Sequence, residues 1–282
     1  MLLKLFQLAF KTGGFISPRL AGLAAYNLWM TPRRFKTPVS EQTTLQSANL
    51  AFITVNNNNI ATYRWGHSPS TSKATVLLVH GWAGRGTQPG CFIEPLIKAG
   101  YQVLSFDAPA HGKSSAKQTN LLEIADVIVA LQGHYGVFDS MITHSLGGLC
   151  AVLAVKNGLK TNRIVSLCPP ATTSGLFEKF VRTLQLNKKT RNNLIQRIET
   201  IYGKHILQKL SMTDLVKNIT VPGFVIHDAQ DNDIPWEEGQ AVAYAWQNAP
   251  FKITSELGHR KILRDPEVIK ATIEFLQQTS TK

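Results

Sequence analysis

The sequence predicts an α/β protein with a mostly parallel central sheet and helices on both faces. From about residue 45 onward, short apolar runs alternate with longer amphipathic segments. Continuous apolar runs such as residues 76–80 are typical of strands that are buried on both faces. Segments with apolar residues three and four positions apart are typical of helices that cover such a sheet. The repeated alternation of the two kinds of segment favours parallel strand pairing.

The expected elements follow one another in a simple order. Leu50–Val55 and Ile60–Trp65 flank Asn56–Asn59, which indicates a hairpin with a polar turn. The further strands are expected at residues 76–80, 103–107, 137–143, 164–168, 223–227 and 251–254. Further helices are expected at residues 89–98, 121–132, 146–156, 237–246 and 266–277. The first of these is expected to end at Gly100, which would cap it.

The alternation stops after Pro169 and Pro170, and residues 171–221 contain no convincing strand. Phe177, Phe180, Val181 and Leu184 have the spacing of one helix face, residues 194–202 repeat that spacing, and a third helix is expected near residues 206–216. The sequence therefore predicts three parts: a helical extension over residues 1–40, a core made of 41–170 and 222–282, and a helical cap or lid over 171–221.

Composition narrows the class of protein. A hydrophobic content of 44% with 17% charged residues fits a globular chain and argues against disorder. Of the net charge of +12, residues 1–40 contribute six Lys or Arg and no acid, while residues 171–221 contribute nine bases against three acids. Any anionic partner should therefore be sought at these two segments. The alternative, which we favour, is solvated positive charge opposite packed apolar faces. Nucleic acid is not expected as a partner, because the lid lacks interleaved aromatic residues or a recognised module.

The cysteines and the N-terminus bear on location. Cys91, Cys150 and Cys168 are odd in number and have no CxxC spacing, which indicates reduced thiols, no metal site and a cytoplasmic chain. The apolar run at residues 5–10 is too short for a signal-peptide core or a bilayer span.

In a helix, Lys4, Gln7 and Lys11 would form one polar stripe and leave the remaining faces of the N-terminal segment apolar. Such a helix must either be buried against the domain or lie on a membrane surface. Burial is the interpretation that we favour. Peripheral contact with an anionic membrane is the alternative.

The first chemical signal is Ser145, which lies between an expected strand and an expected helix. A sharp strand-to-helix turn needs small residues two positions before and after its apex. Gly147 meets this requirement, whereas Thr143 departs from the usual Gly-x-Ser-x-Gly pattern. The turn would expose the serine hydroxyl beside a helix N-terminus, as a nucleophile requires. The alternative is an ordinary serine that caps the helix.

The second signal is the glycine-rich run at residues 80–84, which follows another expected strand. Acyl transfer needs backbone amides that stabilise the tetrahedral oxyanion. The amide of Trp82 in this run and that of Leu146, next to the nucleophile, are the expected donors. The alternative is a simple glycine-rich turn.

Two further residues complete the pattern. Asp231 and His259 each follow a late strand, so the chain order is serine, aspartate, histidine. An imidazole can take the proton of a serine hydroxyl, and a carboxylate can fix the tautomer of that imidazole. We therefore expect Ser145, Asp231 and His259 to form a catalytic triad.

Five blocks of sequence, at residues 80–88, 106–114, 143–148, 225–236 and 258–266, resemble the signature blocks of bacterial α/β-hydrolases. Across residues 20–278 the chain is similar to their esterase- and lipase-like branch. The resemblance implies an α/β-hydrolase fold with a helical lid.

The resemblance also bears on the acidic and histidine residues. It implies that Asp231 is the triad acid, because it stands four residues before Pro235. Asp228 is the main rival for that role. The resemblance further implies that Asp107 is structural and that His111 shapes its loop.

The expected function is a serine hydrolase that cleaves carboxylic esters, including lipid-like esters, through an acyl-enzyme. Its partner would be a small ester or acyl substrate, and no metal or organic cofactor is implied. Thioester hydrolysis or acyl transfer would use the same triad. The rival from another class is a hydrolase-fold protein that binds a ligand without catalysis.

Overall fold

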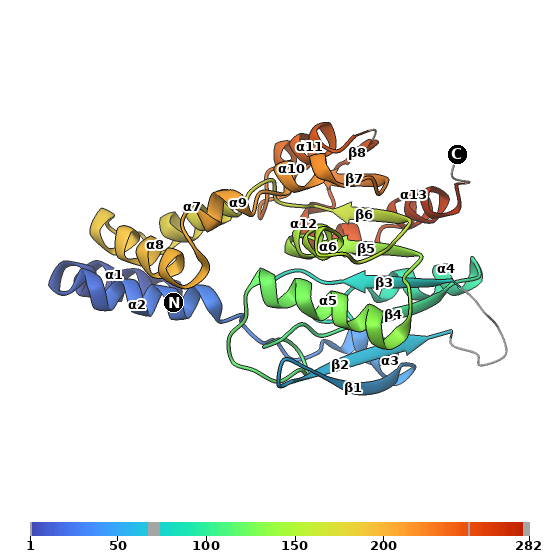
Figure 1. The fold of residues 1–282 in the computed structure, drawn as a ribbon, viewed down its shortest axis with the longest axis horizontal. Helices are drawn as coiled ribbons and strands as arrows, with labels where there is room; N and C mark the ends of the chain where they lie inside the picture. Colours follow the sequence, from blue (N-terminus) through green and yellow to red (C-terminus); the bar gives the residue numbers. More distant parts are fainter. Residues whose placement is uncertain (1, 67–73, 248, 279–282) are drawn as a thin grey trace.

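The computed structural model describes residues 2–66, 74–247 and 249–278. Within these ranges, eight strands form one sheet in the order β1-β2-β4-β3-β5-β6-β7-β8 (Figure 1). The strands are β1 (Asn49–Val55), β2 (Asn58–Trp65), β3 (Thr75–Val79), β4 (Gln102–Phe106), β5 (Ser140–His144), β6 (Arg163–Leu167), β7 (Gly223–Asp228) and β8 (Phe251–Thr254). Strand β2 pairs antiparallel with β1 and β4, and the other neighbours are parallel. The predicted α/β fold class is confirmed.

Helices cover both faces of this sheet. The core helices are α3 (Gln42–Gln46), α4 (Ile93–Lys98), α5 (Leu121–Tyr135), α6 (Leu146–Lys156), α11 (Trp236–Ala245), α12 (Gly258–Lys261) and α13 (Pro266–Gln277). Short 3₁₀ helices are η1 (Val39–Glu41), η2 (Gly90–Phe92) and η4 (Ile262–Arg264). Within β3, Leu77 and Val79 pack with α5 and α6, whereas Val76 and Leu78 pack with α4 and α13. This alternation explains why the run is continuously apolar: side chains of successive strand residues enter opposite layers.

The segment between β6 and β7 is helical, and we call residues 171–221 the helical insertion. It contains α7 (Thr173–Thr183), α8 (Lys188–Tyr202), α9 (Ile206–Lys209), α10 (Met212–Leu215) and η3 (Val216–Asn218). The prediction of a continuous third helix near residues 206–216 is wrong. The backbone is extended at Ser211, which pairs with Thr172, and the Met212 amide donates to the Ala171 carbonyl oxygen at 2.9 Å.

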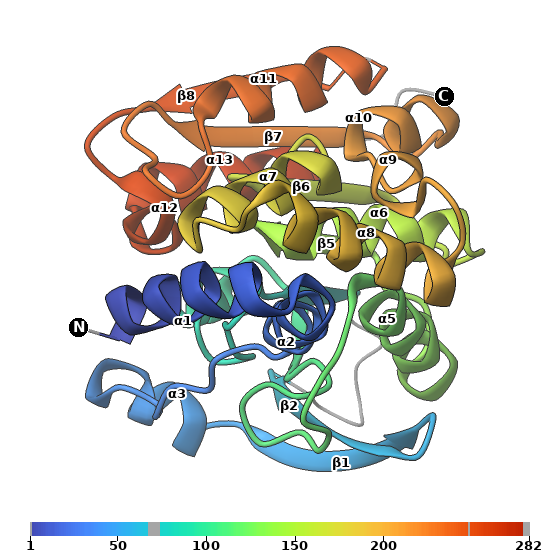
Figure 2. The same ribbon diagram turned by 90° about the vertical axis from the view of Figure 1, so that its left-hand side faces the viewer.

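The N-terminal helices α1 (Leu2–Ile16) and α2 (Pro18–Met30) lie beside α7 and α8 (Figures 1 and 2). Helix α2 packs most closely, because Gly22 lies against α8, where an added Cβ would be 2.7 Å from Asn193 Cβ. Tyr26 of α2 shares a buried cluster with Phe177 of α7 and Leu194 of α8. The N-terminal helices and the helical insertion therefore form one layer at the end of the sheet where β5 meets α6.

The prediction that the apolar faces of the first helix are buried is wrong for most of α1. Phe10 is buried, but Leu5, Leu8, Phe15 and Ile16 are exposed. The reason is that α2 makes the more extensive contact with α8, whereas α1 lies against the start of α8 near Gly14. Among the described residues, no helix is long and apolar enough to cross a bilayer.

Candidate active site

Ser145 lies at the apex of a sharp turn between β5 and α6. Its backbone torsion angles, φ +54° and ψ −129°, are strained for an L-residue. The turn is tight because Gly147 lies against the end of β3, where an added Cβ would be 2.6 Å from the His80 carbonyl oxygen. Thr143, the departure from the usual motif, fits because its hydroxyl donates to the Val165 carbonyl oxygen at 3.1 Å. The Ser145 side chain makes no capping hydrogen bond to α6, so the capping alternative is not supported.

The glycine-rich loop after β3 passes directly beside this turn, and β3 is paired with β5. An added Cβ at Gly81 would be 2.9 Å from Ser145 Cβ, so glycine is needed for the close approach. Trp82 follows at once in the loop. Leu146 is the first residue of α6, and the first amides of a helix have no intrahelical acceptor. The two predicted oxyanion donors therefore lie on the segments that flank Ser145.

Asp231 and His259 form a hydrogen-bonded pair, in which His259 Nδ1 donates to Asp231 Oδ2 at 2.6 Å. The other carboxylate oxygen accepts from the amides of Asp233 and Ile234 at 2.8 and 2.9 Å. Burial opposes ionisation of Asp231, but hydrogen bonds from His227, His259 and the Ile234 amide outweigh it and hold the pKa of this carboxyl well below its usual range. In the neutral ring, donation from Nδ1 to this carboxylate leaves the lone pair on Nε2.

Asp228, the predicted rival for the acid, has a different position. Its carboxylate accepts hydrogen bonds from the amides of Leu257 and Gly258 at 3.1 and 2.8 Å. It therefore fixes the loop that leads into His259, while the imidazole itself contacts Asp231.

Two buried histidines near this pair were missed by the sequence reasoning. His144 Nε2 donates to the main-chain carbonyl oxygen of His259 at 2.7 Å, and the two rings lie 4.6 Å apart. His227 Nε2 donates to the Ile234 carbonyl oxygen at 3.0 Å and lies 3.3 Å from Asp231 Oδ2. Neither contact has a signal in the spacing of the sequence, beyond the position of His144 next to the predicted nucleophile.

His111 supports the loop that carries Trp82. Its Nε2 accepts from the Ala83 amide at 3.0 Å, and its Nδ1 donates to the Pro109 carbonyl oxygen at 2.9 Å. Burial lowers the pKa of His111 to about 3, so the ring is neutral. The shaping role that the family resemblance implies for His111 agrees with these contacts.

Asp107 is also structural, as the resemblance implies. Its carboxylate accepts from the hydroxyl of Tyr63 at 2.6 Å and from the amides of Gly86 and Lys113 at 2.7 Å each. These hydrogen bonds join three segments of the core, and none of them involves Asp231 or His259.

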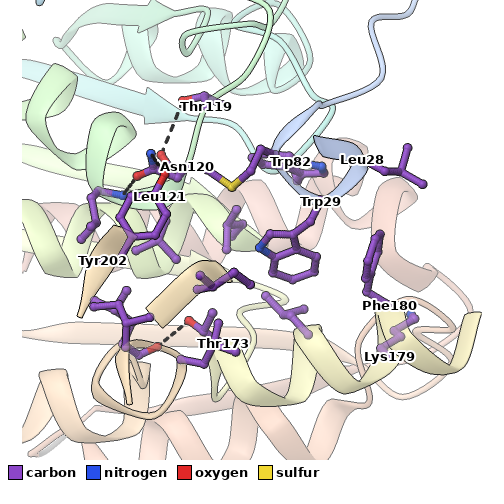
Figure 3. Close-up of a pocket in the computed structure, with 18 of the residues that line it drawn as sticks. Leu28, Trp29, Trp82, Thr119, Asn120, Leu121, Thr173, Lys179, Phe180 and Tyr202 are labelled. Atoms are coloured by element: carbon purple, nitrogen blue, oxygen red, sulfur yellow. Dashed lines mark hydrogen bonds between the residues drawn. The ribbon is translucent and has the colours of Figure 1, made fainter. Parts of the chain in front are cut away.

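Two cavities open on Ser145. The first, which we call the apolar cavity, has a volume of about 360 Å³ and is enclosed by α2, α5, α7, α8 and α9. Figure 3 shows Trp29 of α2 between Trp82 and Phe180, with the rings of Trp29 and Phe180 edge to face at 5.0 Å. The second, the polar cavity, has a volume of about 520 Å³ and is lined by both Ser145 and His259. The structure thus brings the predicted nucleophile and base to one cavity.

One group of side chains has the composition of a metal site. The potential ligand atoms of Cys168, His227 and Asp231 lie within 4.8 Å of one another. A metal would need the thiolate, but burial and the neighbouring Asp231 charge raise the pKa of the Cys168 thiol. Asp231 already accepts from His259 and two amides. These residues therefore suit a hydrogen-bond network around the carboxylate better than a metal ion.

Comparisons with known proteins agree with the observed fold. A family model described as the alpha/beta hydrolase fold matches residues 74–218. A 2-hydroxy-6-oxo-6-phenylhexa-2,4-dienoate hydrolase from Burkholderia cepacia is 26% identical over 150 residues, which span 50% of this chain and 50% of that relative.

Solved structures are similar over more of the chain. An esterase from Pyrococcus furiosus has a TM-score of 0.63 at 20% identity and covers 88% of this chain and 96% of its own. A thioesterase domain from the curacin biosynthetic pathway has a TM-score of 0.61 at 17% identity and covers 82% of this chain and 99% of its own. At these identities the likeness shows the fold alone.

Proposed function

Because this chain belongs to the α/β-hydrolase fold family, we propose that it is a serine hydrolase that cleaves carboxylic esters through an acyl-enzyme. The observation that carries the proposal is the position of Ser145. It lies at a strained turn and faces both the apolar cavity and the cavity lined by His259. A nucleophile, a base and a site for an apolar acyl group therefore meet at one residue.

The first half of the reaction is acylation. Ser145 Oγ attacks the carbonyl carbon of the ester while His259 Nε2 takes the hydroxyl proton. Asp231 stabilises the imidazolium that forms, through its 2.6 Å hydrogen bond to Nδ1. The amides of Trp82 and Leu146 stabilise the negative charge on the carbonyl oxygen. His259 then gives its proton to the leaving alkoxide, and the acyl group stays on Ser145.

The second half is hydrolysis of the acyl-enzyme. His259 takes a proton from water, the resulting hydroxide attacks the acyl carbon, and the Ser145 oxygen leaves with the proton from His259. The acyl group is expected to occupy the apolar cavity. Its lining is mostly hydrophobic, with Trp29, Phe180 and Leu207 among the side chains. Such a pocket favours apolar acyl chains over acetyl, because each buried methylene adds about 0.8 kcal/mol.

The test is a panel of p-nitrophenyl esters with acyl chains from acetyl to dodecanoyl. We expect kcat/KM to rise with chain length and then fall, with a maximum beyond butyryl. Ser145→Ala is expected to reduce kcat by at least about 10⁴-fold with an unchanged circular dichroism spectrum. Ser255→Ala is the matched control, because Ser255 is an exposed serine just after β8.

Labelling with a fluorophosphonate probe separates catalysis from simple binding. Wild type and Ser255→Ala are expected to become labelled, whereas Ser145→Ala is expected to stay unlabelled. A folded wild-type protein that neither reacts with the probe nor cleaves any ester of the panel would favour a non-catalytic binding function instead.

A further inference from the structure

The two cavities at Ser145 differ in chemical character. Trp82, Ser145, Leu176 and Lys179 line both, so the cavities meet at the nucleophile. His259 lines the polar cavity and is absent from the lining of the apolar one. A substrate that spans Ser145 would therefore place one part in apolar and the other in polar surroundings.

The polar cavity is strongly cationic. Its lining includes the basic residues Lys36, Arg85, Lys179, Arg260 and Arg264, and the acidic residues Glu41 and Asp233. Glu41 accepts two hydrogen bonds of 2.6 Å from Arg85 and one of 2.7 Å from Thr87, so it neutralises Arg85. Lys179 donates to the carbonyl oxygens of Asn232 and Asp233. The lining then still contains Lys36, Arg260 and Arg264 against the single carboxylate of Asp233.

The order of the proposed reaction decides which part of the substrate enters this cavity. The leaving group departs with a proton from His259 and so must lie on the His259 side of Ser145. That side is the polar cavity, and the acyl chain is left with the apolar cavity. A cleft lined by charges of one sign attracts a ligand of the opposite sign, so the polar cavity favours an anionic leaving group.

We propose, on the basis of the proposed function, that the natural substrate joins an apolar acyl chain to a phosphate-bearing leaving group. In the reaction the bond between the acyl carbon and the oxygen or sulfur of the leaving group breaks, and that atom takes the proton from His259. Water supplies the hydroxyl group of the released acid. The phosphate stays intact and binds near Arg260 and Arg264, which follow His259 in α12 and η4.

The experiment uses matched pairs of substrates at the acyl length that the ester panel favours. One pair is the acyl ester of glycerol 3-phosphate and that of glycerol. The other is the coenzyme A thioester and the N-acetylcysteamine thioester. We expect the phosphorylated member of at least one pair to have a kcat/KM at least about tenfold higher, which is about 1.4 kcal/mol, and this advantage to shrink in 0.5 M salt. The pair that shows the advantage identifies an alcohol or a thiol as the leaving group.

The double variant Arg260→Gln/Arg264→Gln is expected to lower the ratio of kcat/KM for the phosphorylated and neutral members at least tenfold. Lys156→Gln/Lys160→Gln is the control, because these exposed lysines lie at and just after the last residue of α6, the end of that helix away from Ser145. A ratio near one in wild type for both pairs, or a ratio that the Arg260/Arg264 variant leaves unchanged, would overturn the proposal. Cleavage of the neutral esters in that case would leave the proposed serine hydrolase function standing.

A different observation carries a second inference, about a surface rather than a substrate. Leu5, Leu8, Phe15 and Ile16 of α1 are exposed, Phe15 by 88% and Ile16 by 82%. At 3.6 residues per turn these four side chains fall within an arc of about 100°. Lys4 and Lys11 fall at one edge of the same arc, and residues 1–40 contain no acidic side chain.

We infer that this face of α1 docks on the surface of an anionic lipid bilayer. An apolar arc next to lysines matches the acyl and headgroup layers of such a surface. The position of the face supports this partner, because the adjoining α2 contributes Leu28, Trp29 and Met30 to the apolar cavity. If the chain docks through α1, the part of the apolar cavity that α2 lines would lie close to the lipid.

Co-sedimentation with vesicles of phosphatidylglycerol or phosphatidylcholine tests this inference. We expect at least tenfold stronger partitioning onto the anionic vesicles at low salt, with loss in 0.5 M salt. Leu5→Ser/Leu8→Ser/Phe15→Ser should weaken it at least tenfold. Val137→Ser/Ile253→Ser is the control, since these exposed apolar residues lie in the core domain. Equal partitioning onto both kinds of vesicle would overturn the inference. So would self-association, measured by light scattering, that the α1 variant abolishes, because the exposed face of α1 would then bind a second copy of the chain.

Discussion

The imidazole of His144 donates a hydrogen bond of 2.7 Å to the main-chain carbonyl oxygen of His259, which is 115 residues away in the sequence. The residue directly before the proposed nucleophile therefore holds the backbone of the proposed base. Burial, reinforced by the neighbouring His259, lowers the pKa of His144 to about 3, so its ring stays neutral. We interpret His144 as a positioning residue that sets the distance between the segments that carry the proposed nucleophile and the proposed base.

His144→Phe should therefore reduce kcat about tenfold, or about 1.4 kcal/mol, with little change in KM, because it removes the donor but keeps an aromatic ring. His144→Gln should recover part of the loss, since its amide can donate to the same oxygen. Steady-state kinetics on a p-nitrophenyl ester provide the measurement. A rise in KM with kcat unchanged would argue against a positioning role.

The two aspartates near His259 should respond differently to loss of charge. Asp231→Asn is expected to reduce kcat by about 10³- to 10⁴-fold, because the amide favours the wrong tautomer of His259. Asp228→Asn is expected to act mainly on stability, by about 1–3 kcal/mol, because the buried carboxylate accepts several hydrogen bonds. Kinetics and urea unfolding of both variants make the comparison. Similar losses of kcat in the two would leave the acid unassigned.

Much of the core could be predicted because local patterns agree with the final structure. The predicted helix 266–277 has the bounds of α13, since Asp265 caps it and Pro266 occupies its first position. The parallel strands could be predicted from continuous apolar runs, because a strand that is buried on both faces has apolar side chains on both faces. Ser145, Trp82, Asp231 and His259 could be proposed as site residues because each follows a predicted strand.

Contacts between distant segments could not be predicted in the same way. The sequence pattern of α1 predicts a partner for its apolar residues, but it does not show that α2 makes the more extensive contact with α8. The contact of His144 with His259 depends on how two loops meet above the sheet. The break at Ser211 depends on its pairing with Thr172. Each of these outcomes is decided by tertiary packing rather than by local propensity.

Arg34 offers a test of how the N-terminal segment is held to the core. Its guanidinium donates to the carbonyl oxygens of Ala110, Ser114 and Ala116 at 2.9, 2.8 and 2.8 Å. Arg34→Ala should lower the free energy of unfolding by about 2 kcal/mol, because hydrogen bonds from a charged group contribute more than neutral ones.

Arg33→Ala is the matched control, since the neighbouring Arg33 stacks on Phe35 at the surface. Urea unfolding and limited proteolysis would show the difference, with faster cleavage near residue 34 in Arg34→Ala. Equal stability of the two variants would mean that the N-terminal segment is held by the packing of α2 alone.

The buried neutral histidines predict how stability depends on pH. Burial lowers the pKa of His80, and it lowers those of His111 and His144 to about 3 each. In the unfolded chain these groups titrate near 6.5. Between these values the unfolded state binds more protons than the folded state, so the folded state loses stability as the pH falls below about 6.5. His111 and His144 each contribute a slope of up to about 1.4 kcal/mol per pH unit, and His80 adds to it in the same direction.

Urea unfolding at pH 6.0, 5.0 and 4.5 measures this slope. His144→Gln removes one of the three groups while it keeps a donor for the His259 carbonyl oxygen, so its slope should be shallower by about 1.4 kcal/mol per pH unit. His205→Gln is the control, because His205 is exposed and lies apart from the three buried histidines in the sequence. A wild-type stability that stays flat down to pH 4.5 would show that the buried rings take up protons in the folded state.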